Sequence, residues 1–280
     1  MENSLLKLIA SMSPAEKRQF ILSTKKQVSS SKYLDLFKLI DKHKNLEWIS
    51  IKEKFKAIYP TSAIESTASY LNKLLIDILI QNKLLNDETY KLLYGLLQIK
   101  VLQERNLSEG AYSEIKRNIL LASKYQELPL LHLLKRKELN YLSDINFKGI
   151  KEKDLIAKQV VAKDILRNIR NTQEHYTLYE LLKHRLSHTS QTLSDETKTK
   201  LNDLVLSEIA IINTNIKGNV ESKKLHLLFQ SFFFIKTGDY RSALKTFYVL
   251  NELYEKNLLE LQRPPIDYFS MLDGILDSLR

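Results

Sequence analysis

Two of the six histidines have the spacing of metal ligands. His184 and His188 lie four residues apart on a predicted helix, and Glu180, one turn earlier, could supply a third ligand. Lys183 and Arg185 flank the pair, however, and the glutamate that zinc proteases carry between such histidines is absent. We therefore interpret the histidines as a solvated helix face and expect no bound metal.

Other catalytic signatures are missing from the sequence. The chain has no cysteine, which excludes thiol catalysis and cysteine-ligated metals. Its two closest glycines, Gly95 and Gly110, are too far apart for a phosphate-cradling loop, and no Gly-x-Ser-x-Gly elbow occurs. Carboxylate pairs such as Asp273 and Asp277 have no nucleophile or base beside them. We expect a non-enzymatic protein with no cofactor and no small-molecule substrate.

Basic residues are concentrated toward the N-terminus. Residues 1–86 contain 14 Lys+Arg and 8 Asp+Glu, so this part carries a net charge of +6 out of the chain's +10. Four of these residues lie on early predicted helices and could neutralise phosphates: Lys17, Arg18, Lys25 and Lys26. Nucleic-acid binding is therefore an alternative function, although solubility also explains the lysines.

The elements that would position these residues are predicted to be helices throughout. The chain has 51 leucines but only 7 valines, 6 glycines and 5 prolines, and its apolar residues recur at three- and four-residue steps. Ser13-Pro14-Ala15-Glu16 and Ser62-Ala63-Ile64-Glu65 have the pattern of capping boxes, and Gly149, Gly218 and Gly238 are placed to end helices. We expect an all-α fold whose helices begin near residues 2, 14, 32, 47, 62, 87, 109, 127, 150, 173, 194, 220, 240 and 264.

Two regions differ in helix spacing. Residues 1–86 form shorter helices and contain the only tryptophan, Trp48, whereas from residue 87 helices recur every 18–26 residues, a period of roughly 40–47 per helix pair. We expect a basic N-terminal helical subdomain over 1–86 and a helical-repeat array over 87–280. The last helix is strongly apolar, so it either caps the array or belongs to a longer one.

One segment resembles a known repeat family. Gly238-Asp239-Tyr240-Arg241-Ser242-Ala243 follows one apolar helix and starts another, as in the turn of a tetratricopeptide repeat. The large, small and aromatic positions of that repeat match Leu227, Phe234, Ser231, Ala243 and Phe247, although Leu250 stands where alanine is usual and no proline ends the second helix. The resemblance covers residues 225–255 and implies a right-handed stack of antiparallel helical hairpins.

The resemblance also implies a binding face. In such repeats the inner face of the first helix binds peptides, and the matching positions here are Leu225, Leu228, Phe232, Ile235 and Lys236. The same face could instead be buried against a neighbouring helix. The leading hypothesis is a scaffold that binds a protein or peptide on a concave helical surface.

The sequence also bears on location. No stretch reaches the length of about 18 uncharged apolar residues that a membrane span needs. Glu2 and Lys7 interrupt the pattern of an export signal. We expect a cytoplasmic protein without membrane association, and the abundant lysine, isoleucine and asparagine suggest a bacterial source.

Overall fold

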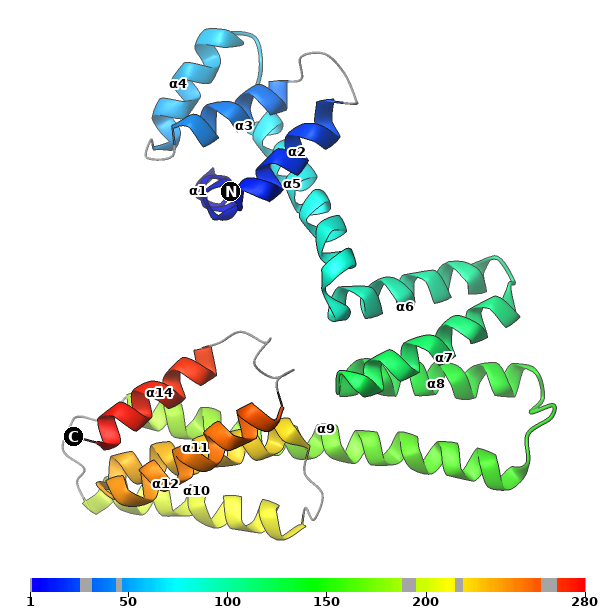
Figure 1. Cartoon of the computed structure of the whole chain (residues 1–280), viewed down its shortest axis with the longest axis vertical. Helices are drawn as coiled ribbons and strands as arrows, with labels where there is room; N and C mark the ends of the chain where they lie inside the picture. Colours follow the sequence, from blue (N-terminus) through cyan, green and yellow to red (C-terminus); the bar gives the residue numbers. More distant parts are fainter. Residues whose placement is uncertain are drawn as a thin grey trace. The chain divides into compact units, whose positions relative to one another are not determined.

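A computed structural model describes residues 2–25, 32–43, 47–187, 195–214, 219–257 and 266–279. Within these ranges the chain forms thirteen helices and no strand (Figure 1). The predicted all-α class is confirmed for these residues. The expected helix starts agree to within about two residues, with one exception in the middle of the chain.

The chain divides into two compact units, residues 1–94 (unit 1) and residues 95–280 (unit 2). The division falls inside α6 (Glu88–Glu104), a few residues after the expected boundary at residue 86. Each unit has its own hydrophobic core, and no residue belongs to both cores.

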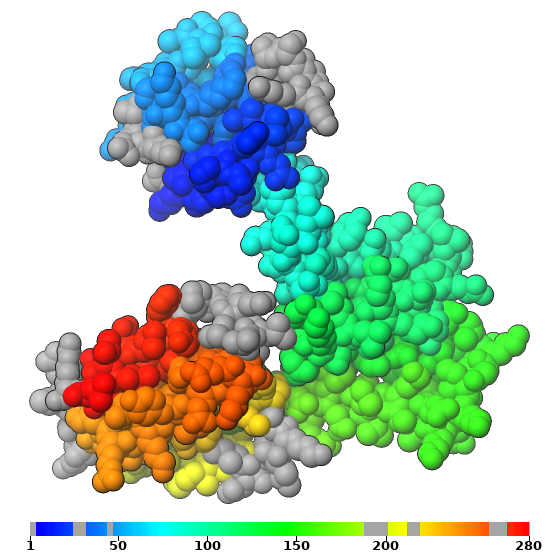
Figure 2. Space-filling view, viewed as in Figure 1, coloured from blue at the N-terminus to red at the C-terminus, as the bar shows by residue number. Residues whose placement is uncertain are grey.

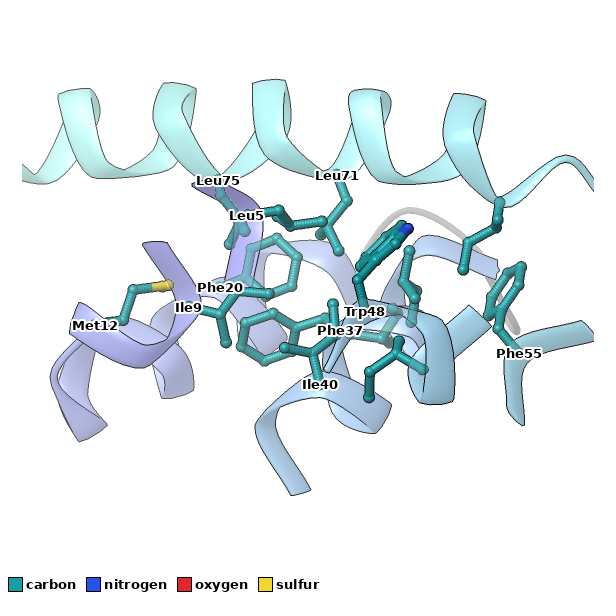
Figure 3. Packing of buried hydrophobic residues seen from close by; sticks show 14 of the residues in the cluster. Leu5, Ile9, Met12, Phe20, Phe37, Ile40, Trp48, Phe55, Leu71 and Leu75 are labelled. Carbon is teal, nitrogen blue, oxygen red and sulfur yellow. The ribbon is translucent and has the colours of Figure 1, made fainter. Parts of the chain in front are cut away.

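Unit 1 packs four short helices and one long helix around aromatic side chains. Its complete helices are α1 (Glu2–Ser11), α2 (Pro14–Lys25), α3 (Lys32–Lys42), α4 (Trp48–Ile58) and α5 (Ile64–Asn86), and the first part of α6 follows them. Phe20 and Phe37 are fully buried with ring centroids 4.5 Å apart, and Leu71 and Leu75 of α5 cover them (Figure 3). Aromatic and aliphatic burial of this kind holds short helices that are marginal in isolation.

The two predicted capping boxes behave differently. At the start of α2, the Ser13 N–H donates to Glu16 Oε2 at 2.7 Å and the Glu16 N–H donates to Ser13 Oγ at 3.3 Å, so the first box is confirmed. The second prediction is wrong, because α5 begins after Ala63 without any side-chain cap. Ser62 Oγ instead accepts a hydrogen bond from Lys32, and Glu65 pairs with Lys52.

Unit 2 packs its helices largely in chain order. They are the second part of α6, α7 (Ser108–Lys124), α8 (Leu128–Asp144), α9 (Glu152–Ser187), α10 (Asp195–Thr214), α11 (Val220–Thr237), α12 (Tyr240–Lys256) and α14 (Ile266–Ser278). α7 packs on α8, α8 on α9, α9 on α11, α11 on α12 and α12 on α14, while α10 lies against α9 (Figure 1).

The helix start expected near residue 173 does not exist. α9 runs unbroken for 36 residues, from Glu152 to Ser187, because no glycine or proline interrupts it. Thr172 resembles a capping residue in sequence, yet its hydroxyl donates to the Asn168 carbonyl one turn earlier at 2.9 Å. α9 is therefore long enough to contact α8 through one half and α10 and α11 through the other.

Four turns share one left-handed geometry. Asn106, Gln126, Asn146 and Gly238 follow α6, α7, α8 and α11 with φ between 51° and 80°. After each, the next backbone N–H donates to a carbonyl five residues back: Leu107 to Leu102, Glu127 to Ala122, Phe147 to Leu142 and Asp239 to Phe234. This is the Schellman pattern, which ends a helix and turns the chain back. Gly238 was predicted to end a helix, and this is confirmed.

Candidate functional site

A pocket of about 310 Å³ lies in unit 2, where the N-terminal ends of α8 and α11 meet the middle of α9. Its lining combines a largely apolar floor with amides, hydroxyls and two carboxylates. The lining residues are Gln126, Glu127, Leu128, Pro129, Ile169, Thr172, Gln173, Tyr176, Asn219, Val220 and Glu221.

One hydrogen-bonded junction fixes α11 to α9 beside the pocket. The Asn219 side chain accepts from the Ser222 N–H at 2.7 Å and so caps α11, while its Nδ2 donates to Thr172 Oγ1 at 2.9 Å. The same residue therefore starts one helix and binds a second. This holds the two pocket walls at a defined distance.

A second junction closes the wall one turn further along α9. The Tyr176 hydroxyl donates to Glu221 Oε1 at 2.5 Å, and Lys224 Nζ pairs with the same oxygen at 2.8 Å. The side chains of Lys224 and Glu221 are mostly buried, which makes such charge-assisted bonds stronger than exposed ones. The wall is thus preorganised rather than assembled by a ligand.

The third side of the pocket is the turn between α7 and α8. Gln126 adopts the left-handed conformation with φ of 54°, and Pro129 occupies the first turn of α8, where its missing N–H costs nothing. Gln126, Pro129 and Gln173 are exposed at the rim of the pocket. The pocket is therefore open to a segment lying across its mouth.

The lining offers apolar surface and hydrogen-bonding groups rather than a histidine, cysteine, serine or lysine. Among the described residues, no group of three histidine, aspartate or glutamate side chains is placed to hold a metal ion. An apolar stem with a hydrogen-bonding tip fits the floor and the polar wall.

The face predicted to bind a peptide lies elsewhere on α11. Leu225 is 2% exposed and Leu228 0% exposed, because α11 packs against α9 on one side and α12 on the other. Phe232 is half-buried, with its ring 6.2 Å from those of both Tyr179 and Phe247. These side chains belong to the core of unit 2 rather than to an open groove.

The C-terminal end of that face, at Lys236, is exposed to solvent. Ile235 is half-buried and packs at the edge of the core of unit 2, whereas Lys236 is exposed in the last turn of α11. Beyond it, Asp239 caps α12 by accepting from the Ser242 N–H at 3.1 Å, and Ala243 and Phe247 are fully buried. The turn between α11 and α12 forms as its residues predict.

The basic residues proposed for phosphate binding are not all free. Lys17 pairs with Asp41 at 2.7 Å across α2 and α3, so its charge is already engaged. Arg18 is exposed, Lys25 is the last residue of α2, and Lys26 lies outside the described residues. Phosphate binding by these residues stays a prediction.

The structure describes one of the two histidines with metal-ligand spacing. His184 is exposed on α9, and its partner His188 lies outside the described residues. Glu180, the possible third ligand, is exposed on the same helix.

A buried titratable cluster joins α9, α10 and α11. Glu208 of α10 hydrogen-bonds to His226 Nδ1 of α11 at 2.7 Å, and the ring of His175 of α9 lies 6.2 Å from that of His226. Burial raises the pKa of Glu208, although the hydrogen bond with His226 opposes this. Burial also lowers the pKa of His175, as does the nearby His226. Sequence reasoning missed this cluster.

A second buried charge joins α8 to α9. Glu138 accepts from Lys158 at 2.5 Å and from Lys135 at 3.2 Å. Burial alone would raise the pKa of Glu138, but the hydrogen bonds and charges of Lys158 and Lys135 outweigh it and lower the pKa. Both lysines are satisfied by one carboxylate, so this group fixes helix packing.

Comparison with known proteins adds no further constraint. No protein-family profile, curated protein or solved structure matches the chain. Among the described helices, none combines the length and apolar composition needed to cross a membrane.

Proposed function

We propose that unit 2 is a non-enzymatic protein-interaction scaffold. In this proposal its helices form a right-handed stack of hairpins resembling a tetratricopeptide array. The stack binds an extended peptide that inserts one long side chain into the pocket between α8, α9 and α11. The observation that carries the proposal is the pocket itself, with walls held by the Thr172–Asn219 and Tyr176–Glu221 bonds.

The shape of the pocket favours a side chain of a larger ligand. Leu128, Pro129, Ile169 and Val220 offer apolar surface for a methylene stem, and the exposed amides of Gln126 and Gln173 at the rim can pair with its tip. The exposed rim leaves room for the peptide backbone outside.

The proposal differs from the groove predicted from sequence in its location. Leu225 and Leu228 have no surface to offer, whereas the pocket lies at the other end of α11 from Lys236. The role of the chain as a peptide-binding scaffold is retained. Its anchor becomes the α8–α9–α11 pocket.

Blocking the pocket tests this function. Linear peptides would be selected by display against the full chain, and their affinities measured by calorimetry for wild type and Gln173→Trp. Gln173 is exposed at the pocket rim, so the indole fills the opening without disturbing a buried group. We expect the selected peptides to bind at least about tenfold more weakly to this variant, a change of about 1.4 kcal/mol.

The matched control is Gln159→Trp, the same substitution at an exposed position of the same helix outside the pocket. It should leave the affinities unchanged. If Gln173→Trp binds every selected peptide as wild type does, or if no linear peptide is selected at all, the pocket is not a peptide site.

A further inference from the structure

α14 has two apolar faces that adjoin each other around the helix. Its inner face packs Met271, which is fully buried, and Gly274 against the rest of unit 2. Four large side chains point outward at steps of three, four and three residues, which places them in one row along the helix. This outer α14 stripe consists of Phe269, Leu272, Leu276 and Leu279, with exposed fractions of 58%, 38%, 61% and 62%.

The inner contacts prevent α14 from rolling to bury the stripe. Gly274 lies so close to the buried Phe247 ring that a Cβ atom there would be 2.2 Å from it. Tyr268 meets Tyr254 edge to face, with ring centroids 5.5 Å apart. The helix is therefore held by its inner face, and its atoms, drawn in red, lie at the surface of unit 2 (Figure 2).

The stripe has the apolar composition and the polar border of an interaction surface. Contiguous exposed apolar patches of a few hundred Å², bordered by polar residues, typically mark contact sites. Asp273 is exposed beside the row, and α14 as a whole contains three aspartates and no lysine or arginine. The C-terminal end of the helix adds the negative pole of its dipole.

This charge decides between possible occupants. Pairing of two copies through their α14 helices would bring the negatively charged aspartates of both copies together, and their repulsion is unfavourable. A partner with basic residues beside its apolar row would instead gain attraction along the same contact. The negative charge of α14 is also unusual in a chain whose net charge is +10.

We propose that the outer α14 stripe is the docking site for an amphipathic helix of a partner protein, whose apolar row is flanked by lysine or arginine. The partner's apolar side chains pack between Phe269, Leu272, Leu276 and Leu279, and its basic residues lie over Asp273. This site is separate from the α8–α9–α11 pocket and does not depend on its function.

The probe is a synthetic helical peptide of about five turns that carries leucines along one face and lysines elsewhere. Its binding to the full chain would be measured by fluorescence anisotropy. Leu276→Gln should weaken binding about tenfold, because it removes the burial of most of one leucine side chain. Leu120→Gln is the matched control, since Leu120 is 73% exposed on α7 and should not matter.

The charge contribution is tested on the same assay. Asp273→Asn should weaken binding of the lysine peptide several-fold and reduce the dependence of its affinity on salt concentration. A peptide with glutamate in place of lysine should bind much more weakly to wild type. Gln173→Trp, which blocks the pocket, should leave binding of the lysine peptide unchanged, so failure of one proposal is distinguishable from failure of the other.

Three results would overturn the proposal. The first is equal binding of the lysine peptide to Leu276→Gln and to Leu120→Gln. The second is equal binding of the lysine and glutamate peptides to wild type. The third is a wild-type dimer in sedimentation velocity that Leu276→Gln converts to monomer, which would make a second copy of the chain the occupant.

Discussion

At the scale of single residues, His175 and Glu208 give unit 2 opposite responses to pH. They belong to one buried cluster that joins α9, α10 and α11 through His226. Besides these three groups, Glu174 is the charged side chain that acts on His175, and it favours the protonated ring. The net effect of burial and His226 is nevertheless a lowered pKa for His175.

We predict that acid weakens unit 2 through His175. The unfolded imidazole takes up a proton near pH 6.5, whereas the buried ring resists it, so the unfolded state binds more protons in this range. Stability should fall as the pH falls from 6.5 through the lowered pKa, and His175→Gln should flatten this slope. Urea unfolding followed by far-ultraviolet circular dichroism measures it; an unchanged slope in the variant would remove His175 as the cause.

We predict the reverse for Glu208. Its folded pKa is raised, so the folded carboxyl keeps its proton to a higher pH than the unfolded one. The resulting stabilisation is fully present below pH 4.5 and is lost as the pH rises through the raised pKa. Glu208→Gln, which can still accept from His226, should therefore gain stability relative to wild type as pH rises above that range. The difference between the two urea midpoints across pH would show this, and a constant difference would contradict it.

At the scale of helices, two glycines inside helices have opposite roles. Gly274 of α14 touches the Phe247 ring, which is fully buried, whereas a Cβ atom on Gly110 of α7 would meet nothing closer than 3.8 Å. Glycine is a poor helix former, so only close packing explains its place in the middle of α14.

We predict that Gly274→Ala destabilises the protein by about 1–3 kcal/mol, because the added methyl overpacks the contact with α12. Gly110→Ala is the matched control and should stabilise it by up to about 1 kcal/mol, because alanine is the better helix former. Urea unfolding gives both values, and hydrogen exchange should rise in α12 and α14 of Gly274→Ala. A neutral or stabilising Gly274→Ala would show that α14 does not pack as closely as described.

At the scale of the whole molecule, the described residues of unit 1 and those of the C-terminal part of unit 2 form separate hydrophobic cores that share no residue. Trp48 is the only tryptophan and belongs to the core of unit 1, so its fluorescence reports that unit, while circular dichroism reports helices of both. Separate cores of this kind make separate unfolding transitions the expected behaviour.

We predict that Phe37→Ala lowers the stability of unit 1 by about 3–5 kcal/mol, since Phe37 is fully buried against Phe20. The Trp48 transition should move to lower urea, while hydrogen exchange in α11 and α12 stays as in wild type. Phe247→Ala, the corresponding change in unit 2, should speed hydrogen exchange in α11 and α12 and leave the Trp48 transition as in wild type. Equal shifts of both signals in both variants would mean that the units unfold together.

The sequence by itself determined the helices and most of their ends. The capping box at Ser13, the left-handed turn at Gly238 and the three- and four-residue apolar spacing act over a few residues, so they can be recognised locally. Local signals gave a wrong prediction at two positions. Ser62 does not cap a helix, because its hydroxyl accepts from Lys32, and no helix begins near residue 173, because Thr172 donates back to Asn168 within a continuous helix.

Only the tertiary structure decided which apolar faces are buried and where the pocket lies. Leu228 and Leu276 are alike in sequence, yet one is fully buried between helices and the other is exposed on the outer α14 stripe. The pocket brings together Gln126, Thr172 and Asn219, which are far apart along the chain. Burial depends on which helices pack on which, and that is set by long-range contacts that hydrophobic periodicity alone does not encode.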